Sequence, residues 1–553
     1  MFFAHDLDKN FYYRGLVEPY PGIFRDYLTT PTQIAVDVES ISLKNRTAVG
    51  IGFSPNPAMS FYFPLYPTQS PVIPWHLLDN PNITKIFHNS LFDLSCLWNY
   101  PTAITNIKDT AIMAHLLGIP GGLSDLYELH QSEVHDMGLL LGRGQTTLDL
   151  PTETIARKCM EDTIATYILY LKLLDNTDQQ YFDVEMKLIP ILDKMSRRGI
   201  KLDQKVRHQL EVKLKEEIEI YLDICDKEGF NPNSPQQVSY ILAKRGAYSG
   251  FSKLPFTRKG NRGNLSTAKE ILGRMDDPLA AMVTVYKGQA TLLGNYILPW
   301  EGCDRAYTRF HEEAITGRIS SLSRNLNNIP KGEPRNIFLP DNGIWTDMDF
   351  NQLELRILAY LSQDREMMYI FSLPKLNPDG SPNIEADIHQ QVADALGIGR
   401  YIAKNINYEM VYGSSEQTMA DTAKTRDIGK ASKMKQMWFQ KFPQAGDCIE
   451  SWKMEALDTP YIITLFGRRI KLPTPDEDSI DAIMRKGVNY RMQGSAAEIL
   501  KRSIICLADL DLALQVHDEI LIDGFVVDDV FRQLEHISPV YTPVEVNYLE
   551  HWE

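Results

Sequence analysis

The sequence predicts a multidomain protein in which an α/β domain precedes a larger, helix-rich α+β region. Its 553 residues exceed what one hydrophobic core holds, which favours three or four domains. From residue 31 to 175, segments with strand-like and helix-like patterns alternate, as they do in α/β domains. After residue 179, amphipathic helices predominate and are interrupted by strand patterns that carry acids.

The composition is that of an ordinary globular protein, with 44% hydrophobic and 23% charged residues. The six cysteines form no CxxC pair, which argues against a zinc site or a disulfide framework and fits a reducing cytoplasm. No apolar run reaches the roughly 18 residues that a membrane span requires. The first residues contain acids and no cationic start, unlike a signal peptide.

The net charge of −15 counts against nucleic-acid binding through global charge, but it is compatible with a local basic channel. Between residues 244 and 262 the chain carries basic residues and no acid. These are Lys244, Arg245, Lys253, Arg258, Lys259 and Arg262. Such a run is either a solvated loop or, beside a site that handles nucleic acid, a contact for backbone phosphates.

The α/β region is expected to hold its elements in a regular order, each indicated by the spacing of its apolar residues. Strands are expected over residues 33–43, 48–54 and 61–67. Residues 84–98 are expected to begin as a strand and to continue as a helix, and further helices are expected over residues 109–117 and 153–174.

Four carboxylates from separate elements of this region are candidates for a metal site. Asp37 and Glu39 lie two residues apart on a strand and so point to one face. Asp93 starts a helix, and Asp162 lies on a later helix. Four acids brought together would repel one another without cations, and two Mg²⁺ ions about 3.5–4 Å apart are the usual solution in nucleases. Taken singly, each acid could equally be a surface charge or a helix cap.

The strings VDVES, HNSLFD and KCMED contain these acids and resemble the three motifs of the DEDD-type 3′→5′ exonucleases of proofreading DNA polymerases. The resemblance implies an RNase H-like α/β exonuclease domain over residues 1–178, with two Mg²⁺ ions for which Mn²⁺ can substitute. The metal ligands that it implies are Asp37, Glu39, Asp93 and Asp162. One departure is Lys158, which stands where the family has Tyr, or His in a sister branch, to orient the attacking water.

Residues 180 to 300 are predicted to be mostly helical, with apolar stripes and charged outer faces. The strings GIKLD and NPNSPQQV, and the stretch from Arg309 to Pro330, resemble family A DNA polymerases, the bacterial DNA polymerase I type. The resemblance implies a thumb over residues 179–305, which would grip duplex DNA through its backbone. It also implies that Arg318, in TGR, reaches the primer-terminal base pair.

The stretch IWTDMDFNQLELRILAY reads as a buried strand that ends at Asp349 and continues as an amphipathic helix. A lone acid at a strand end is often only a helix cap or turn former. A second pair, Asp518 and Glu519 in QVHDEILI, lies in a strand–turn–strand pattern, where an ordinary polar turn is the alternative. Together, Asp349 and Asp518 can hold two Mg²⁺ ions, which suits phosphoryl transfer to a primer end.

Two further sets of side chains recur every four residues and therefore follow a helix face. The first set is Arg400, Lys404, Tyr408 and Tyr412, and the second is Arg485, Asn489 and Gln493. Cations can pair with triphosphate oxygens, and an aromatic ring can stack on a base. Donors of the second set can reach the minor-groove edge, where correct base pairs offer similarly placed acceptors. Solvated amphipathic helices are the alternative for both.

These strings also match family A, in which the pattern RxxxKxxx(F/Y)xxxYG marks the fingers helix. The resemblance implies a right-hand polymerase with an antiparallel palm sheet over residues 306–365 and 481–553 and helical fingers over residues 366–480. The catalytic residues implied are Asp349, Asp518 and Glu519. The nucleotide-binding residues implied are Arg400, Lys404, Tyr408, Tyr412, Glu354 and His389. The residues implied to contact primer-template are Arg318, Arg485, Asn489, Gln493 and His517.

We therefore expect a template-directed DNA polymerase with 3′→5′ proofreading that binds primer-template DNA and dNTPs as a single catalytic chain without a membrane. No 5′-nuclease domain precedes the exonuclease motifs, which is more typical of a bacteriophage or organellar replicase. We accordingly expect the chain to replicate a genome in the host cytoplasm or in an organelle. Its expected partners are a helicase or primase and a processivity factor.

A single-subunit RNA polymerase is the closest alternative because it shares the palm acids and the Lys/Tyr helix. Glu354, which in family A blocks a ribose 2′-hydroxyl, and the exonuclease motifs oppose it. A catalytically silent DNA-binding subunit is opposed by the retention of every metal-ligating acid.

Overall fold

A computed structural model describes residues 2–6, 11–14, 31–67, 73–100, 103–119, 121–127, 141–175, 179–249, 251, 254–256, 265–311, 314–322, 325–423 and 427–552. Of the basic run, Lys244 and Arg245 are among these residues, whereas Lys253, Arg258, Lys259 and Arg262 lie outside them. Within these ranges, no helix combines the length and the apolar character needed to cross a membrane.

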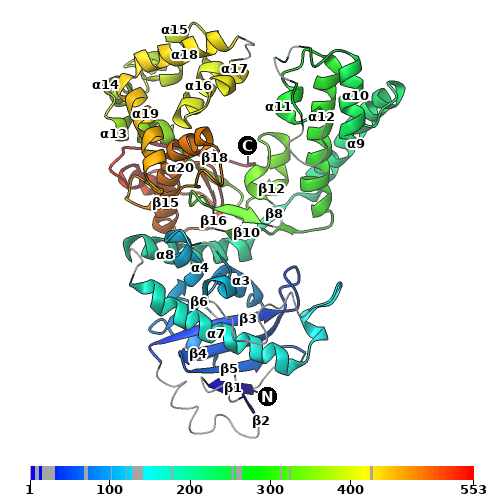
Figure 1. The fold of residues 1–553 in the computed structure, drawn as a ribbon, viewed down its shortest axis with the longest axis vertical. Helices are drawn as coiled ribbons and strands as arrows, with labels where there is room; N and C mark the ends of the chain where they lie inside the picture. Colours follow the sequence, from blue (N-terminus) through cyan, green and yellow to red (C-terminus); the bar gives the residue numbers. More distant parts are fainter. Residues whose placement is uncertain are drawn as a thin grey trace.

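The N-terminal domain is an α/β fold on a seven-stranded sheet of order β2-β1-β5-β4-β3-β6-β7 (Figure 1). Strands β3, β6 and β7 run parallel, and the other neighbours are antiparallel. The strands are β1 (Phe2–Asp6), β2 (Phe11–Arg14), β3 (Gln33–Ser40), β4 (Ala48–Asn56), β5 (Met59–Pro64), β6 (Thr84–Phe87) and β7 (Ile107–Asp109). The helices are α2 (Trp75–Asp79), α3 (Ser90–Cys96), α4 (Thr110–Leu116), α5 (Leu123–Tyr127) and α7 (Thr152–Leu174).

The elements expected in this domain are confirmed. Helix α7 packs against β3, β4 and β5, and Ile51 and Phe53 of β4 share a buried core with residues of α2 and α3, so β4 and β5 are buried along almost their whole length. Asp109 starts α4 by accepting hydrogen bonds from the amides of Ala111 and Ile112.

The second half of the molecule is organised around a four-stranded antiparallel sheet of order β16-β17-β13-β18. The strands are β13 (Trp345–Phe350), β16 (Leu512–Val516), β17 (Glu519–Asp523) and β18 (Val544–Leu549). Trp345, Met348 and Phe350 of β13 are buried in the core. The chain then turns at Gln352, in the left-handed region with φ 55°, into α13 (Leu353–Ser362), which packs on α20 (Ile480–Cys506).

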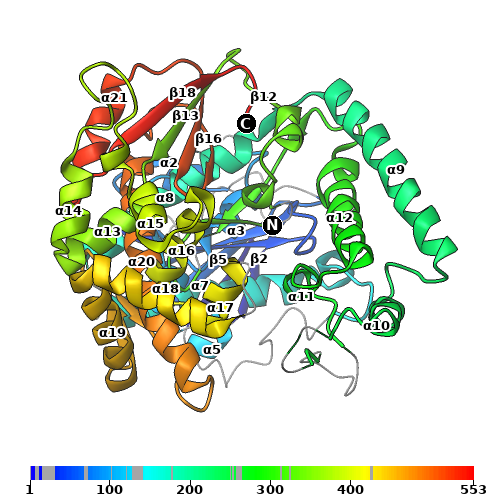
Figure 2. The ribbon, with the colours of Figure 1, turned by 90° about the horizontal axis from the view of Figure 1, so that it is seen from above.

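Two groups of helices stand on opposite sides of this sheet (Figures 1 and 2). The group expected to form the thumb is α9 (Gln204–Lys227), α10 (Pro235–Lys244), α11 (Lys269–Leu272) and α12 (Pro278–Leu292), and it has a small core of its own. The group expected to form the fingers is α14 (Arg365–Ser372), α15 (Ile388–Leu396), α16 (Arg400–Val411), α17 (Glu416–Thr422), α18 (Ile428–Lys441) and α19 (Pro443–Asp458).

Short elements connect these parts. A three-stranded sheet has the order β12-β8-β9, with β8 (Ile200–Leu202), β9 (Arg305–Ala306) and β12 (Phe338–Leu339). Two further sheets have two strands each: β10 (Arg309–His311) with β11 (Ser320–Leu322), and β14 (Tyr461–Ile463) with β15 (Arg469–Lys471). Helix α21 (Asp529–Arg532) precedes β18.

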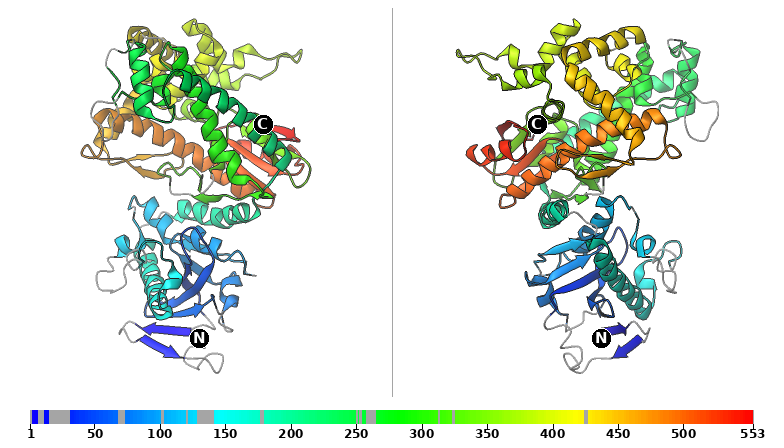
Figure 3. Two further views of the ribbon diagram at one scale, coloured as in Figure 1. Left: turned by 90° about the vertical axis from the view of Figure 1, so that its right-hand side faces the viewer. Right: turned by 60° about the vertical axis from the view of Figure 1, so that its left-hand side comes forward.

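Helix α8 (Gln179–Arg198) lies between the N-terminal domain and the palm (Figures 1 and 3). It packs against α3 and α4 on one side and against α20 and β16 on the other. The segment expected to form the thumb begins at residue 179, but the helices that project beside the palm begin at α9. The difference arises because α8 has apolar and charged partners in two domains, which its amphipathic pattern does not reveal. One such contact is the buried ion pair between Lys501 and Glu185.

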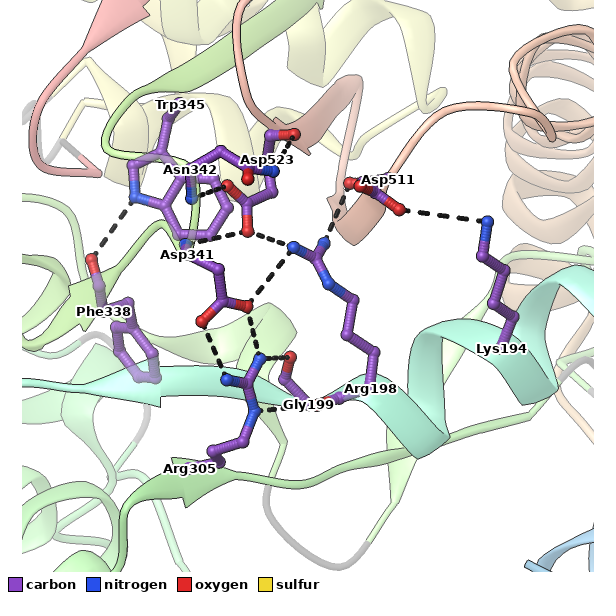
Figure 4. A network of polar contacts seen from close by, with 10 residues as sticks. All are labelled: Lys194, Arg198, Gly199, Arg305, Phe338, Asp341, Asn342, Trp345, Asp511 and Asp523. Carbon is purple, nitrogen blue, oxygen red and sulfur yellow. Dashed lines mark hydrogen bonds and ion pairs between the residues drawn. The ribbon is translucent and has the colours of Figure 1, made fainter.

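The C-terminal end of α8 is fastened to the palm by a network of arginines and aspartates (Figure 4). Arg198 donates a hydrogen bond to the Asp511 carbonyl (3.0 Å) and pairs with Asp523 and Asp341. Arg305 donates two hydrogen bonds to Asp341, at 2.8 and 2.9 Å. Asp523 is the last residue of β17 and pairs with Trp345, whereas Asp349 pairs with Glu519 at the other end of the same two strands. The network therefore holds the end of the sheet that lies away from Asp349.

Candidate active sites

The acids of the palm gather at one end of β13 and β17. Asp349 lies directly opposite Glu519 in the antiparallel register. Asp518 lies in the turn between β16 and β17, where His517 adopts a left-handed conformation with φ 52°. The Asp518 carbonyl accepts a hydrogen bond from the Phe350 amide (3.2 Å). This turn brings Asp518 beside Asp349, the juxtaposition that the sequence predicted.

The electrostatics of this group suits a divalent cation. Burial, with the charges of Glu354 and Asp349, raises the pKa of Asp518 to about 7. Withdrawal from water and the charge of Glu519 raise the pKa of Asp349 to about 6. Within the described part of the chain, the buried Oδ1 of Asp347 has no hydrogen-bond partner. Carboxylate oxygens without protein donors are the ligands that Mg²⁺ prefers, so the donor set fits such an ion.

Glu519 is held differently from the two aspartates. Its carboxylate is buried and accepts hydrogen bonds from Arg335 (3.2 Å) and from the Trp552 indole (2.5 Å). The Arg335 guanidinium also lies 4.1 Å from the centre of the Trp552 ring. The oxygens of Glu519 therefore have protein donors, which leaves Asp349 and Asp518 as the acids with freer oxygens.

Glu354 joins three elements of the site. It lies in the first turn of α13, is 3% exposed, and accepts hydrogen bonds from Arg318 (2.8 Å) and from the Tyr412 hydroxyl (2.6 Å). Burial raises the pKa of Glu354, and both donors partly offset that rise. The carboxylate thus ties the residue after α16 to the stretch around Arg318, and it sets the position of the Tyr412 ring.

His389 is the buried end of a hydrogen-bonded chain in the fingers. The Trp438 indole donates to Oδ1 of Asn407 (2.8 Å), so the amide nitrogen of Asn407 faces Nδ1 of His389 (2.9 Å). Burial lowers the pKa of His389 to about 4, so the ring is neutral near pH 7. A neutral ring that accepts at Nδ1 carries its proton on Nε2 and can donate it.

The remaining predicted residues of α16 differ in their surroundings. Arg400 is exposed and pairs with Asp387 (2.7 Å). Lys404 is exposed and partly offsets the rise in the pKa of Asp349 that burial and Glu519 cause. Burial and then the charge of Asp518 raise the pKa of Tyr408 to about 12, so its hydroxyl is neutral. The structure therefore brings α16 within electrostatic reach of the palm acids.

The side chains expected to contact primer-template lie on the palm. Arg485, Asn489 and Gln493 are half-buried along α20, and the buried Oδ1 of Asn489 has no hydrogen-bond partner among the described residues. Arg318 and His517 line a cavity of about 190 Å³. Asn325, Asn327, Asn328 and Gln515 also line it. All five predicted residues therefore lie either on α20 or around this cavity.

The four acids expected in the N-terminal domain converge across β3, α3 and α7. Asp37 and Glu39 share a face of β3, and their oxygens lie within 4.8 Å of each other and of the Cys159 sulfur. Oδ1 of Asp93 accepts a hydrogen bond from the Val38 amide (3.0 Å). Burial and then neighbouring acids raise the pKa of Asp37 to about 7 and the pKa of Glu39 and Asp93 well above their usual range. Acids confined in this way fit a cation.

Asp162, the fourth acid, has a protein cation beside it. Lys158 lies one turn earlier on α7 and forms an ion pair with Asp162. Both side chains are buried, with 8% and 9% of their residues' surface exposed. The acid set thus fits a cation at Asp37 and Glu39, whereas Lys158 already neutralises the position of Asp162.

Sequence reasoning missed several members of the palm site. Asp347 lies two residues before Asp349 on the same face of β13, and the period of a strand could have identified it. Arg335 and Trp552, which hold Glu519, and Asn407, which orients His389, had no local signal because their partners are distant in the sequence.

Comparison with protein families finds two matches along the chain. Residues 201–536 match the family described as DNA polymerase family A, and residues 23–178 match the family described as 3′-5′ exonuclease. The first match covers more than half of the chain.

Curated relatives are bacterial proteins named DNA polymerase I. The protein of Caldicellulosiruptor bescii is 31% identical over 69% of this chain and 48% of its own length. The protein of Synechocystis is 27% identical over 89% of this chain and 56% of its own length. The protein of Pseudomonas aeruginosa is 28% identical over 92% of this chain and 61% of its own length. The chain therefore spans about half to three fifths of the length of these relatives.

A solved structure, the POL domain of Pol1 from M. smegmatis in complex with DNA primer-template and dNTP, has a similar fold. Its TM-score is 0.75 at 21% identity, and the match covers 96% of this chain and 98% of that one. At this identity, the likeness supports the fold alone.

Proposed function

Because the chain belongs to the family A DNA polymerases, we propose that it extends the 3′ end of a primer on a DNA template with dNTPs. The observation that carries this proposal is the convergence of Asp349 and Asp518 at one end of the palm sheet, within electrostatic reach of Tyr408 and Lys404. Phosphoryl transfer depends mainly on positioning and on positive charge, and this arrangement offers both.

Asp349 and Asp518 would hold two Mg²⁺ ions, or Mn²⁺, which when bound would activate the primer 3′-hydroxyl and stabilise the leaving pyrophosphate. Glu519, held by Arg335 and Trp552, would add negative charge opposite Asp349. The raised pKa of both aspartates supports this assignment, since a bound cation would relieve their mutual repulsion.

The fingers residues would hold the incoming nucleotide. Arg400 and Lys404 are exposed cations that can pair with triphosphate oxygens. His389 can donate the proton on Nε2 to another phosphate oxygen, and the Asn407 amide keeps that tautomer in place. Tyr408, tilted over His389 with ring centres 6.1 Å apart, would stack on the base.

Glu354 and Tyr412 would select the sugar. The hydrogen bond between them fixes a carboxylate and an aromatic ring beside the acids. A ribose 2′-hydroxyl would contact Glu354 and Tyr412, whose oxygens already form hydrogen bonds. A deoxyribose has no 2′-hydroxyl and would leave these hydrogen bonds intact. This supports dNTPs as the substrate class.

The primer-template would lie along the palm between the two groups of helices. Arg485, Asn489 and Gln493 would contact the minor-groove edge, and Arg318 and His517 the primer end. The domain boundaries given above stay part of the proposal, with α8 as the support between the exonuclease domain and the palm.

We further propose that the N-terminal domain removes mismatched nucleotides from the primer 3′ end, with Asp37, Glu39, Asp93 and Asp162 around the reacting phosphate. Their convergence on one buried site supports this. A role in phage genome replication, in host cytoplasm and alongside a helicase, a primase and a processivity factor, is the corresponding cellular proposal. Its test is co-purification of such proteins from phage-infected cells.

Primer extension by the Asp349→Asn variant tests the polymerase proposal. The matched control is Asp509→Asn, which neutralises an exposed acid before β16. We expect extension to disappear in the first variant and to be unchanged in the second. Extension by Asp349→Asn at the rate of the unmodified chain would contradict the proposal.

A further inference from the structure

Lys158 occupies a position in the exonuclease site where a second cation would otherwise be expected. It projects from α7 with Asp162 one turn later, and residues four apart lie on the same helix face. Asp37, Glu39 and Cys159 present their ligand atoms from the facing strand and from α7. The ammonium group therefore pairs with Asp162 on the helix that also carries Cys159, and this helix packs on the strand that carries Asp37 and Glu39.

Lys158 and Asp162 form an ion pair in which both residues are buried. The carboxylate of Asp162 therefore already has a cation as its partner in the folded chain. The position beside Asp162 is taken by the ammonium group of Lys158.

From this arrangement we propose that the exonuclease site takes a single divalent cation, held by Asp37 and Glu39, and that Lys158 replaces a second cation beside Asp162. The inference rests on the proposed exonuclease function of the domain. It departs from the two-ion site that the sequence resemblance implies.

Displacement of Lys158 by a metal ion is disfavoured by its surroundings. With 8% of its surface exposed, the residue has little contact with water. A divalent ion at Asp162 would leave a buried ammonium without its partner and next to a like charge, and both changes are unfavourable. The ligand atoms of Asp37 and Glu39, by contrast, lie within 4.8 Å of each other, so an ion can bind there while the pair of Lys158 and Asp162 stays intact.

Metal counting tests the proposal without relying on catalysis. The full chain carrying Asp349→Asn and Asp518→Asn, which removes the two polymerase ligands, is titrated with Mn²⁺ and followed by electron paramagnetic resonance and calorimetry. Lys158→Met and Lys158→Gln remove the charge with two different side chains, Lys158→Arg keeps it, and Lys172→Met is the control at an exposed position of α7.

We expect one Mn²⁺ ion in the parent chain, a second ion in Lys158→Met and Lys158→Gln, and one ion in Lys158→Arg and Lys172→Met. Adding Asp37→Ala and Glu39→Ala should abolish the ion of the parent chain. Equal binding of two ions by the parent chain and both uncharged variants would overturn the proposal, as would no binding by any of them.

A parallel assay of primer degradation separates this inference from the proposed function. One ion in the parent chain and two in Lys158→Met, without degradation by either chain or by Lys158→Tyr, would refute the exonuclease function and leave the metal count standing.

Discussion

Replacing Asp518 with asparagine should stabilise the metal-free protein while abolishing primer extension. Burial and the charges of Glu354 and Asp349 raise the pKa of Asp518 from its ordinary 3.8 to about 7. At pH 8 the ionised carboxylate of Asp518 therefore has a higher free energy in the folded state than in the unfolded chain. Asparagine has nearly the same shape and no charge, and the Asp518 carboxylate has no hydrogen bond within the described residues that asparagine would lose.

The pKa of Asp518 sets the size and sign of this effect. Such a rise corresponds to at most about 4 kcal/mol, and contact of the half-buried side chain with water and salt reduces it to about 1–2 kcal/mol. Because the folded state binds the extra proton, the free energy of unfolding falls as pH rises from about 4 to about 7. The advantage of asparagine is thus absent below pH 4, partial at pH 5 and complete above pH 7.

The assay is thermal unfolding in EDTA at pH 5 and pH 8, with Asp509→Asn as the control for an exposed acid. We expect Asp518→Asn to unfold roughly 1–2 °C above the parent chain at pH 8 and by a smaller margin at pH 5. Mg²⁺ should stabilise the parent chain more than the variant, because the variant keeps only the cation site at Asp37 and Glu39. A variant that unfolds at or below the parent temperature at pH 8, or by the same margin at both pH values, would show that the Asp518 carboxylate does not destabilise the folded state.

Three further changes test other parts of the site and of the fold. Glu354→Ala leaves the Tyr412 hydroxyl without its acceptor, so discrimination against ribonucleotides, measured as a ratio of kcat/KM values, should fall about tenfold or more (about 1.4 kcal/mol); an unchanged ratio would exclude Glu354 from sugar selection. His389→Ala should lower kcat/KM for dNTPs by about tenfold to a hundredfold at every pH from 6 to 9, because the pKa of His389 is about 4; a loss that varies with pH in this range would show a charged ring. Lys501→Met should lower the free energy of unfolding, measured with urea, by about 3–5 kcal/mol, and adding Glu185→Leu should restore most of it, because the buried carboxylate that lost the Lys501 ammonium is then removed; equal loss in both variants would contradict this.

Much of the architecture was accessible from the sequence. Strand and helix patterns in residues 31–175 were predicted because buried strands and amphipathic helices carry local periodicity. The turn holding Asp518 was placed correctly because polar residues interrupt two apolar strands.

Other features depend on contacts between distant residues, which local patterns do not encode. The two-domain role of α8 follows from its packing on α4 and α20, although its sequence is simply amphipathic. The tautomer of His389 depends on Asn407, whose amide is oriented by Trp438, 31 residues further along the chain. Lys158 was recognised as a departure, but its ion pair with Asp162 became evident only when both proved buried.

We expect two separate acid sites in one chain to extend and to shorten the same primer end. This is tested by one gel with matched and 3′-mismatched primers, comparing the parent chain, Asp349→Asn and the double variant Asp37→Ala, Glu39→Ala. Asp349→Asn should lose extension and keep removal of the mismatch, whereas the double variant should extend the matched primer and lose removal. Extension by Asp349→Asn, or removal by the double variant, at the level of the parent chain would contradict the account.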